Sequence, residues 1–143
     1  MLFRSLALAA ALLWPCTAAP EGALAVGQPA DPKQGFSYGV SWDYATPDEA
    51  RERALARCRE QGAPEPARAL CKVIRAFTKQ CVAVALDPKA GTPGAGWAIA
   101  TTREAAEADA TRNCQAAAGR SRQRYCKVIS SRCDGGGEQS RPG

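Results

Sequence analysis

The chain of 143 residues contains no histidine, and this absence excludes several common active sites. Serine and cysteine nucleophiles that depend on a neighbouring imidazole cannot be built from it, nor can zinc centres with histidine ligands. No two cysteines have the CxxC spacing of a zinc or redox pair, and no serine has a lysine three positions later. We therefore expect no metal, no cofactor and no catalytic residues, and we favour a protein that is not an enzyme.

Large apolar side chains are also scarce. Only three Phe, three Trp and three Tyr are present, and much of the 45% hydrophobic content is alanine. A small domain with so thin a core gains much of its stability from cross-links.

One apolar run stands out, at the N-terminus. Leu6 to Trp14 follow the single charge of Arg4 and precede small residues. The run is shorter than the roughly 20 residues that span a bilayer and is typical of a secretory signal peptide. We expect residues 1–19 to be removed near Ala18 or Ala19, with lipid attachment at Cys16 as the alternative. The mature protein would then be periplasmic or secreted and would have no transmembrane segment.

Loss of the signal peptide would leave an even number of cysteines. An even set in a short exported chain predicts disulfides. The six are Cys58, Cys71, Cys81, Cys114, Cys126 and Cys133.

The chain repeats itself around these cysteines. Residues 71–74, Cys-Lys-Val-Ile, return unchanged as residues 126–129, and each copy follows a helix-like segment that carries a cysteine of its own. Thr46, Pro47 and Glu49 mark the start of the first helix, and Thr101 or Thr102 the start of the second. We predict two strand–helix–strand units with an extra strand after the first. Together they form an α+β domain with a mainly antiparallel sheet, two helices on one face and disulfide staples.

The boundaries of this domain follow from composition. Alternating aromatic and branched residues from Gly35 to Tyr44 predict its first strand. The proline- and glycine-rich residues 20–34 predict a flexible arm, and residues 134–143 a disordered tail. The domain would span 35–133.

The repeat also favours one disulfide pattern. A strand that returns antiparallel to the helix begins near the helix end, which favours Cys58–Cys71 and Cys114–Cys126. Cys81–Cys133 would then join the two units. Other pairings, such as Cys58 with Cys81, stay open.

These paired units resemble the bacterial DUF4189 family, a domain of unknown function. The resemblance covers about residues 37–133 and rests on the cysteine spacing, on Gly96-Trp97-Ala98 and on the alanine-rich helices. Residues 40–43 depart from it, since a glycine-richer stretch is usual there. The resemblance implies a secreted or periplasmic protein and no particular activity.

Basic residues predict a binding surface. No acid occurs from Ala110 to Cys133, a stretch that contains the candidate binding residues Arg120, Arg122, Arg124 and Lys127. They favour an anionic macromolecule or an envelope protein as partner, and a merely solvated loop is the alternative. Nucleic acid is the least expected partner of an exported protein.

The tryptophans give a second set of candidates. Trp42 and Trp97 are possible ligand platforms, although core or half-buried packing is the favoured explanation of both. We thus predict an exported, disulfide-stabilised binding module of the cell envelope, an inhibitor or accessory protein. The alternative is an envelope hydrolase that uses carboxylates, for which Asp43, Asp87 and Asp134 are the candidates.

Overall fold

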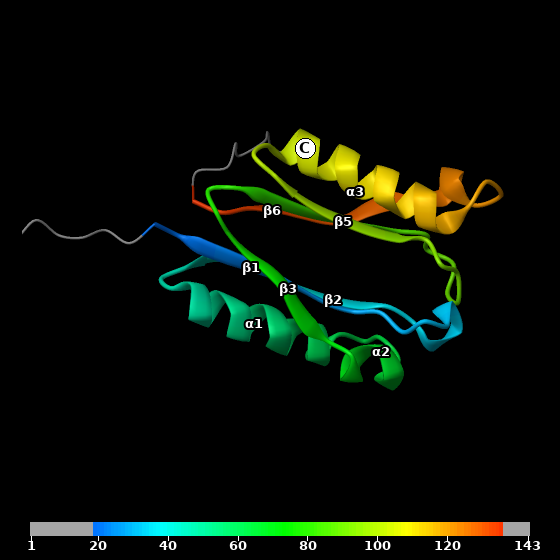
Figure 1. Cartoon of the computed structure of the whole chain (residues 1–143), viewed down its shortest axis with the longest axis horizontal. Helices are drawn as coiled ribbons and strands as arrows, with labels where there is room; N and C mark the ends of the chain where they lie inside the picture. Colours follow the sequence, from blue (N-terminus) through cyan, green and yellow to red (C-terminus); the bar gives the residue numbers. More distant parts are fainter. Residues whose placement is uncertain (1–18, 136–143) are drawn as a thin grey trace, which may run out of the picture.

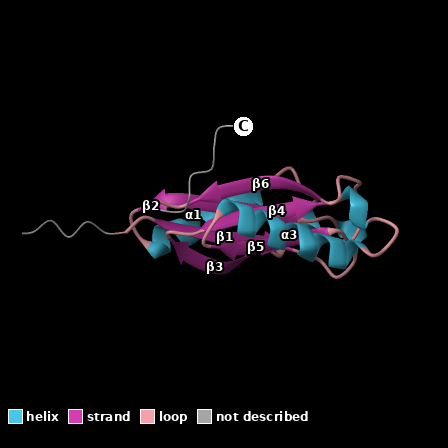
Figure 2. Cartoon of the chain, turned by 90° about the horizontal axis from the view of Figure 1, so that it is seen from above, coloured by secondary structure: helices cyan, strands magenta, loops and turns pink. Residues whose placement is uncertain are grey.

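Two three-stranded sheets pack face to face in a computed structural model that describes residues 19–135, and one long helix covers the outer face of each sheet (Figure 1). Seen from above, the strands run roughly along the long axis of the molecule (Figure 2). The elements are β1 (Glu21–Gly27), η1 (Pro32–Gln34), β2 (Ser37–Tyr44), α1 (Pro47–Glu60), α2 (Glu65–Ala69), β3 (Lys72–Thr78), β4 (Cys81–Leu86), β5 (Ala95–Ala100), α3 (Arg103–Ala118), η2 (Gln123–Tyr125) and β6 (Lys127–Cys133). The predicted signal peptide, except Ala19, and residues 136–143 of the predicted tail lie outside the described residues.

The two halves of the chain have the same topology. The first strand of each half lies at the centre of its sheet, in the orders β2-β1-β3 and β5-β4-β6, and all pairs are antiparallel. Each central strand has an irregularity at the same place, between Leu24 and Ala25 in β1 and between Val84 and Ala85 in β4. The α+β class and the antiparallel pairing are thus confirmed.

The arrangement differs from the expected one in that there are two sheets instead of one, with the helices on opposite outer faces. The central strands explain this, because both of their faces are apolar. In β4 the side chains of Ala83 and Ala85 face α3, and those of Val82 and Val84 face the other sheet. A strand buried on both faces needs a partner layer on each side.

The prediction of a flexible arm at residues 20–34 is wrong for its first half. Glu21–Gly27 form β1, whose residues from Gly22 onward are buried. The prolines and glycines of this segment flank a short apolar run, Ala23–Val26, instead of preventing a strand. Consequently Cys81–Leu86 is not an extra strand of the first half but the first strand of the second.

The tail also begins later than expected. Asp134 is fully buried and accepts hydrogen bonds from two backbone amides. It therefore belongs to the folded domain.

Both long helices begin where the sequence predicts. The Thr46 hydroxyl accepts a hydrogen bond from the Glu49 amide (3.2 Å), and the Thr102 hydroxyl accepts one from the Ala105 amide (3.1 Å). Their buried faces consist of small residues: Ala50, Ala54 and Cys58 in α1, and Ala106, Ala110, Cys114 and Ala118 in α3. Small side chains let each helix lie close to its sheet.

The three predicted disulfides are all present. Cys58–Cys71 and Cys114–Cys126 join each helix to the start of the last strand of its half, with Cα atoms 6.0 and 5.9 Å apart. Cys81–Cys133 links β4 to β6. This last bridge was expected to join the halves, but it lies within the second half because Cys81 belongs there.

Candidate functional site

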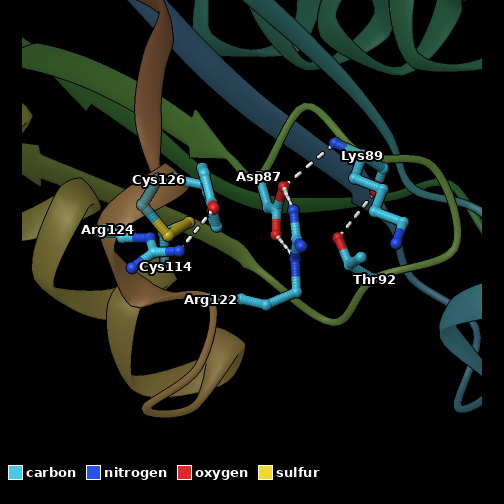
Figure 3. A network of polar contacts seen from close by, with 8 residues as sticks. Asp87, Lys89, Thr92, Cys114, Arg122, Arg124 and Cys126 are labelled. Atoms are coloured by element: carbon cyan, nitrogen blue, oxygen red, sulfur yellow. Dashed lines mark hydrogen bonds and ion pairs between the residues drawn. A yellow bond between two sulfur atoms is a disulfide. The ribbon is translucent and has the colours of Figure 1, made fainter.

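The basic loop before β6 is tied to the fold by one of its own arginines. The Nε and Nη2 atoms of Arg122 donate to the two carboxylate oxygens of Asp87, whose side chain is buried at the end of β4 (Figure 3). The hydrogen bond from Arg122 holds the pKa of Asp87 well below its usual range, and Asp87 raises the pKa of Arg122. Arg122 is therefore engaged within the protein.

The other basic candidates are exposed. Arg120, Arg124 and Lys127 lie on the surface of the loop and of the first residue of β6. The guanidinium groups of Arg122 and Arg124 lie 4.6 and 4.8 Å from the centre of the Tyr125 ring. The surface here thus offers three exposed cations, of which Arg124 lies against the Tyr125 ring.

The candidate carboxylates of a hydrolase have structural contacts. Asp134 accepts hydrogen bonds from the backbone amides of Asp43 (2.7 Å) and Lys79 (3.3 Å), which are the two non-glycine residues with positive φ in the described chain. Burial raises the pKa of Asp134. Asp43 in turn accepts from the amide of Gly135 (2.9 Å). Asp134 thus holds two residues with unfavourable positive φ, Asp43 in β2 and Lys79 between β3 and β4.

The two tryptophans have different neighbours, although both pack beside the core between the sheets. Trp97 stacks on Phe36, with ring centres 5.9 Å apart. Trp42 instead has two cations over its ring, since the guanidinium carbons of Arg57 and Arg132 lie 4.8 and 5.0 Å from its centre.

Trp42 lies in a hollow of about 480 Å³ where β2, α1 and β6 meet, which we call the Trp42 cleft. Both halves contribute to it. The lining includes Tyr38, Trp42, Arg57, Glu60, Gln61, Ser130 and Arg132. Within the described residues, no carboxylate lies within 4.0 Å of the guanidinium of Arg57 or Arg132. The cleft therefore presents two cations that form no ion pair within the described part of the fold.

A corresponding hollow, the Trp97 cleft, lies where β3, β5 and α3 meet. Its lining includes Ile74, Arg75, Trp97, Asp109, Arg112 and Asn113. Asn113 donates to the Trp97 carbonyl (2.9 Å), just as Arg57 donates to the Val40 carbonyl. Here, however, Arg112 forms an ion pair with Asp109. Of the two clefts, only the Trp42 cleft thus has two arginines without an ion-pair partner among the described residues.

A family model described as Domain of unknown function (DUF4189) matches residues 22–133. The chain belongs to this family. The match begins in β1 and ends at Cys133, so the DUF4189 domain contains both halves and all three disulfides. No curated protein and no solved structure matches the chain.

Among residues 19–135, no group of three or more cysteine or acidic side chains is arranged to hold a metal ion. Within the same range, no helix is long and apolar enough to cross a membrane.

Sequence reasoning named Trp42 but missed the two arginines beside it. Arg57 and Arg132 lie 75 positions apart and each directly precedes a cysteine of the frame, Cys58 or Cys133. No local motif connects them. Their common neighbour, Trp42, becomes apparent only when β2, α1 and β6 are placed together.

Proposed function

We propose that this DUF4189 protein is an exported, disulfide-stabilised, non-enzymatic module that binds an anionic partner at the bacterial cell envelope, as an inhibitor or accessory protein. The Trp42 cleft is the observation that carries the proposal. Two guanidinium groups held over one indole, without a carboxylate partner in the described chain, favour binding of an anion supplied by another molecule.

The disulfides support export. Three bridges in so small a domain persist only in an oxidising compartment such as the periplasm or the extracellular space. The N-terminal apolar run supports the same route, with cleavage near Ala18 or Ala19.

The acids support binding over hydrolysis. Asp87 is held by Arg122, and Asp134 is buried against two backbone amides. Neither is placed to protonate a leaving group or activate water in an open site. The exposed Arg120, Arg124 and Lys127 would extend the attraction for an anionic partner.

A capture experiment tests the proposal. The oxidised mature chain, Pro20 to Gly143, is immobilised and exposed to envelope extract from its own source at physiological salt. We expect one stoichiometric partner, whose capture falls for R132Q and stays unchanged for R75Q. Arg75 lines the Trp97 cleft, so R75Q removes the same charge from the corresponding hollow.

Two results would overturn the proposal. One is an eluate with no enriched partner. The other is hydrolysis of peptidoglycan or polysaccharide by the purified protein that is abolished by D43N or D87N.

A further inference from the structure

The lining of the Trp42 cleft contains uncharged polar and acidic side chains in addition to its two arginines. We infer that it is a binding site for a carboxylate-bearing sugar, in which Arg57 and Arg132 hold the carboxylate while Glu60, Gln61 and Ser130 meet hydroxyl groups. This inference rests on the proposed function and narrows its anionic partner to an acidic polysaccharide.

Both guanidinium groups are held in place before any ligand arrives. Arg57 uses Nη1 to donate to the Val40 carbonyl, and Arg132 uses Nη1 to donate to the Ser131 carbonyl at 2.9 Å. The Trp42 ring lies under both. Ordering these long side chains in advance reduces the entropy lost on binding.

Each arginine keeps donors that the described residues do not use. A guanidinium has five N–H donors and matches a planar carboxylate through two parallel hydrogen bonds. In both residues Nε and Nη2 have no acceptor within the described chain. These donors are the ones that a carboxylate would occupy.

The charge of the cleft selects the kind of anion. Two arginines and Glu60 give the lining a net charge of +1, from 2 − 1. That balance suits a singly charged carboxylate better than a doubly charged phosphate, which Glu60 would repel about twice as strongly. The Glu60 carboxylate also only accepts hydrogen bonds, so it favours a ligand with hydroxyl groups nearby.

The size and position of the cleft suit a sugar unit within a longer chain. About 480 Å³ lies in the range of small-ligand sites, roughly 300–1,000 Å³. Glu60 and Gly62, at the end of α1, are exposed and form one side of the hollow. A polymer therefore has room to pass across the surface while one acidic unit enters.

Calorimetric titration of the oxidised mature chain with trigalacturonate tests the inference. Maltotriose is the neutral control, and inorganic phosphate tests whether the oxyanion alone suffices. We expect saturable binding of trigalacturonate at one site per chain and none of maltotriose. R132Q should weaken binding about tenfold or more, the loss of a charge-assisted contact. R75Q, in the Trp97 cleft, should leave the affinity unchanged.

The place of binding is checked by fluorescence. Without the signal peptide, the chain has only two tryptophans, Trp42 and Trp97. In a W97F variant, trigalacturonate should therefore change the emission of Trp42 alone.

Four results would overturn the inference: no saturable binding of trigalacturonate, equal binding of maltotriose, phosphate binding as tight as trigalacturonate, or equal losses for R132Q and R75Q. The proposed function has its own readout. If envelope extract still yields a partner sensitive to R132Q while trigalacturonate fails to bind, only the sugar assignment falls.

Discussion

In the second half of the molecule, Cys81 and Cys133 join the central strand to an edge strand by a disulfide. In the first half, Glu21 and Thr78 occupy the same paired places, and the Thr78 hydroxyl donates to the Glu21 carboxylate at 2.7 Å. The same pair of strands is thus joined by a covalent bond in the second half and by a single side-chain hydrogen bond in the first.

The far ends of the central strands differ in a similar way. At the end of β1, Gly27 lies so close to α2 that a Cβ there would be 2.0 Å from the Ala67 carbonyl oxygen. In the second half, Asp87 stands in the corresponding place, directly after β4, and binds Arg122. The link to the last strand is therefore anchored by a short helix packed on glycine in the first half and by a partly buried ion pair in the second.

The comparison shows which positions the fold requires in both halves and which positions can vary. The halves agree where the backbones touch, since a Cβ at Gly39 would be 2.0 Å from the Ala54 carbonyl oxygen and one at Gly96 2.2 Å from the Cys114 amide. They differ on the cleft surfaces. Counting from these glycines, Trp42 corresponds to Ile99. Counting from the helix cysteines Cys58 and Cys114, Arg57 corresponds to Asn113, and counting from the repeated Cys-Lys-Val-Ile, Arg132 corresponds to Phe77.

The candidate binding site lies where the two halves differ. The close glycines, the helix caps and the helix disulfides are shared by both halves. The cations over an indole occur only in the Trp42 cleft among the described residues. The first half thus supplies most of a site whose last cation, Arg132, comes from the second.

Removal of the Cys81–Cys133 bridge should have the largest effect on stability. In C81A/C133A, opening a loop of 52 residues should lower the free energy of unfolding by roughly 4 kcal/mol. T78V, at the corresponding place in the first half, should cost about 1 kcal/mol because only a hydrogen bond is lost. Urea unfolding measures both losses. Equal losses would contradict the prediction and show that the disulfide and the hydrogen bond stabilise their halves by the same amount.

The two close glycines should be the next most sensitive positions. G39A and G96A should each cost about 1–3 kcal/mol, since the helix must move away from its sheet to admit a methyl group. G62A is the control, because a Cβ there meets nothing within 4 Å. Losses that differ widely between G39A and G96A would show that the two helices are not held equally tightly.

Acid should reveal the Asp87–Arg122 pair, which the first half lacks. Because the folded pKa of Asp87 is depressed, its contribution to stability is present above the ordinary aspartate pKa of about 4 and is lost as the pH falls below it. D87N should therefore lower the melting temperature at pH 7, and its difference from the wild type should shrink below pH 4.

The other buried aspartate, Asp134, has the opposite pH dependence but does not disturb this comparison. Its folded pKa is raised by burial, so its contribution is fully present below the ordinary aspartate pKa and is lost as the pH rises through the folded value. It is common to D87N and the wild type and cancels in their difference. A D87N effect that stayed constant from pH 7 to pH 3 would contradict the role of the ion pair.

Local signals carried most of what could be predicted. Thr46 and Thr102 predict the helix starts because each cap bonds an amide three residues later. The two helix bridges were predictable because their cysteines lie only 13 and 12 positions apart and recur in both units. The run Val82–Ala85 also held an overlooked signal, since an apolar residue at every position is typical of a strand buried on both faces. That pattern predicts a partner layer on each side, and hence two sheets.

Contacts between distant segments were beyond such reasoning. β1 was missed because its proline and glycine neighbours dominate the composition of residues 20–34. Trp42 was identified by residue type alone, whereas Arg57 and Arg132 reach it from α1 and β6. Their meeting depends on how the halves pack, which no spacing in the sequence encodes.

The helix caps should give the smallest effects and the closest agreement between the halves. T46A and T102A should each cost about 1 kcal/mol, because each removes one hydroxyl that accepts a hydrogen bond from the amide three residues later. The caps belong to helices on opposite faces of the molecule, so the double variant should lose the sum of the two, as urea unfolding would show. A double variant that lost much more than this sum would reveal coupling between α1 and α3 through the paired sheets. The halves would then have to be treated as one cooperative unit even at their outer surfaces.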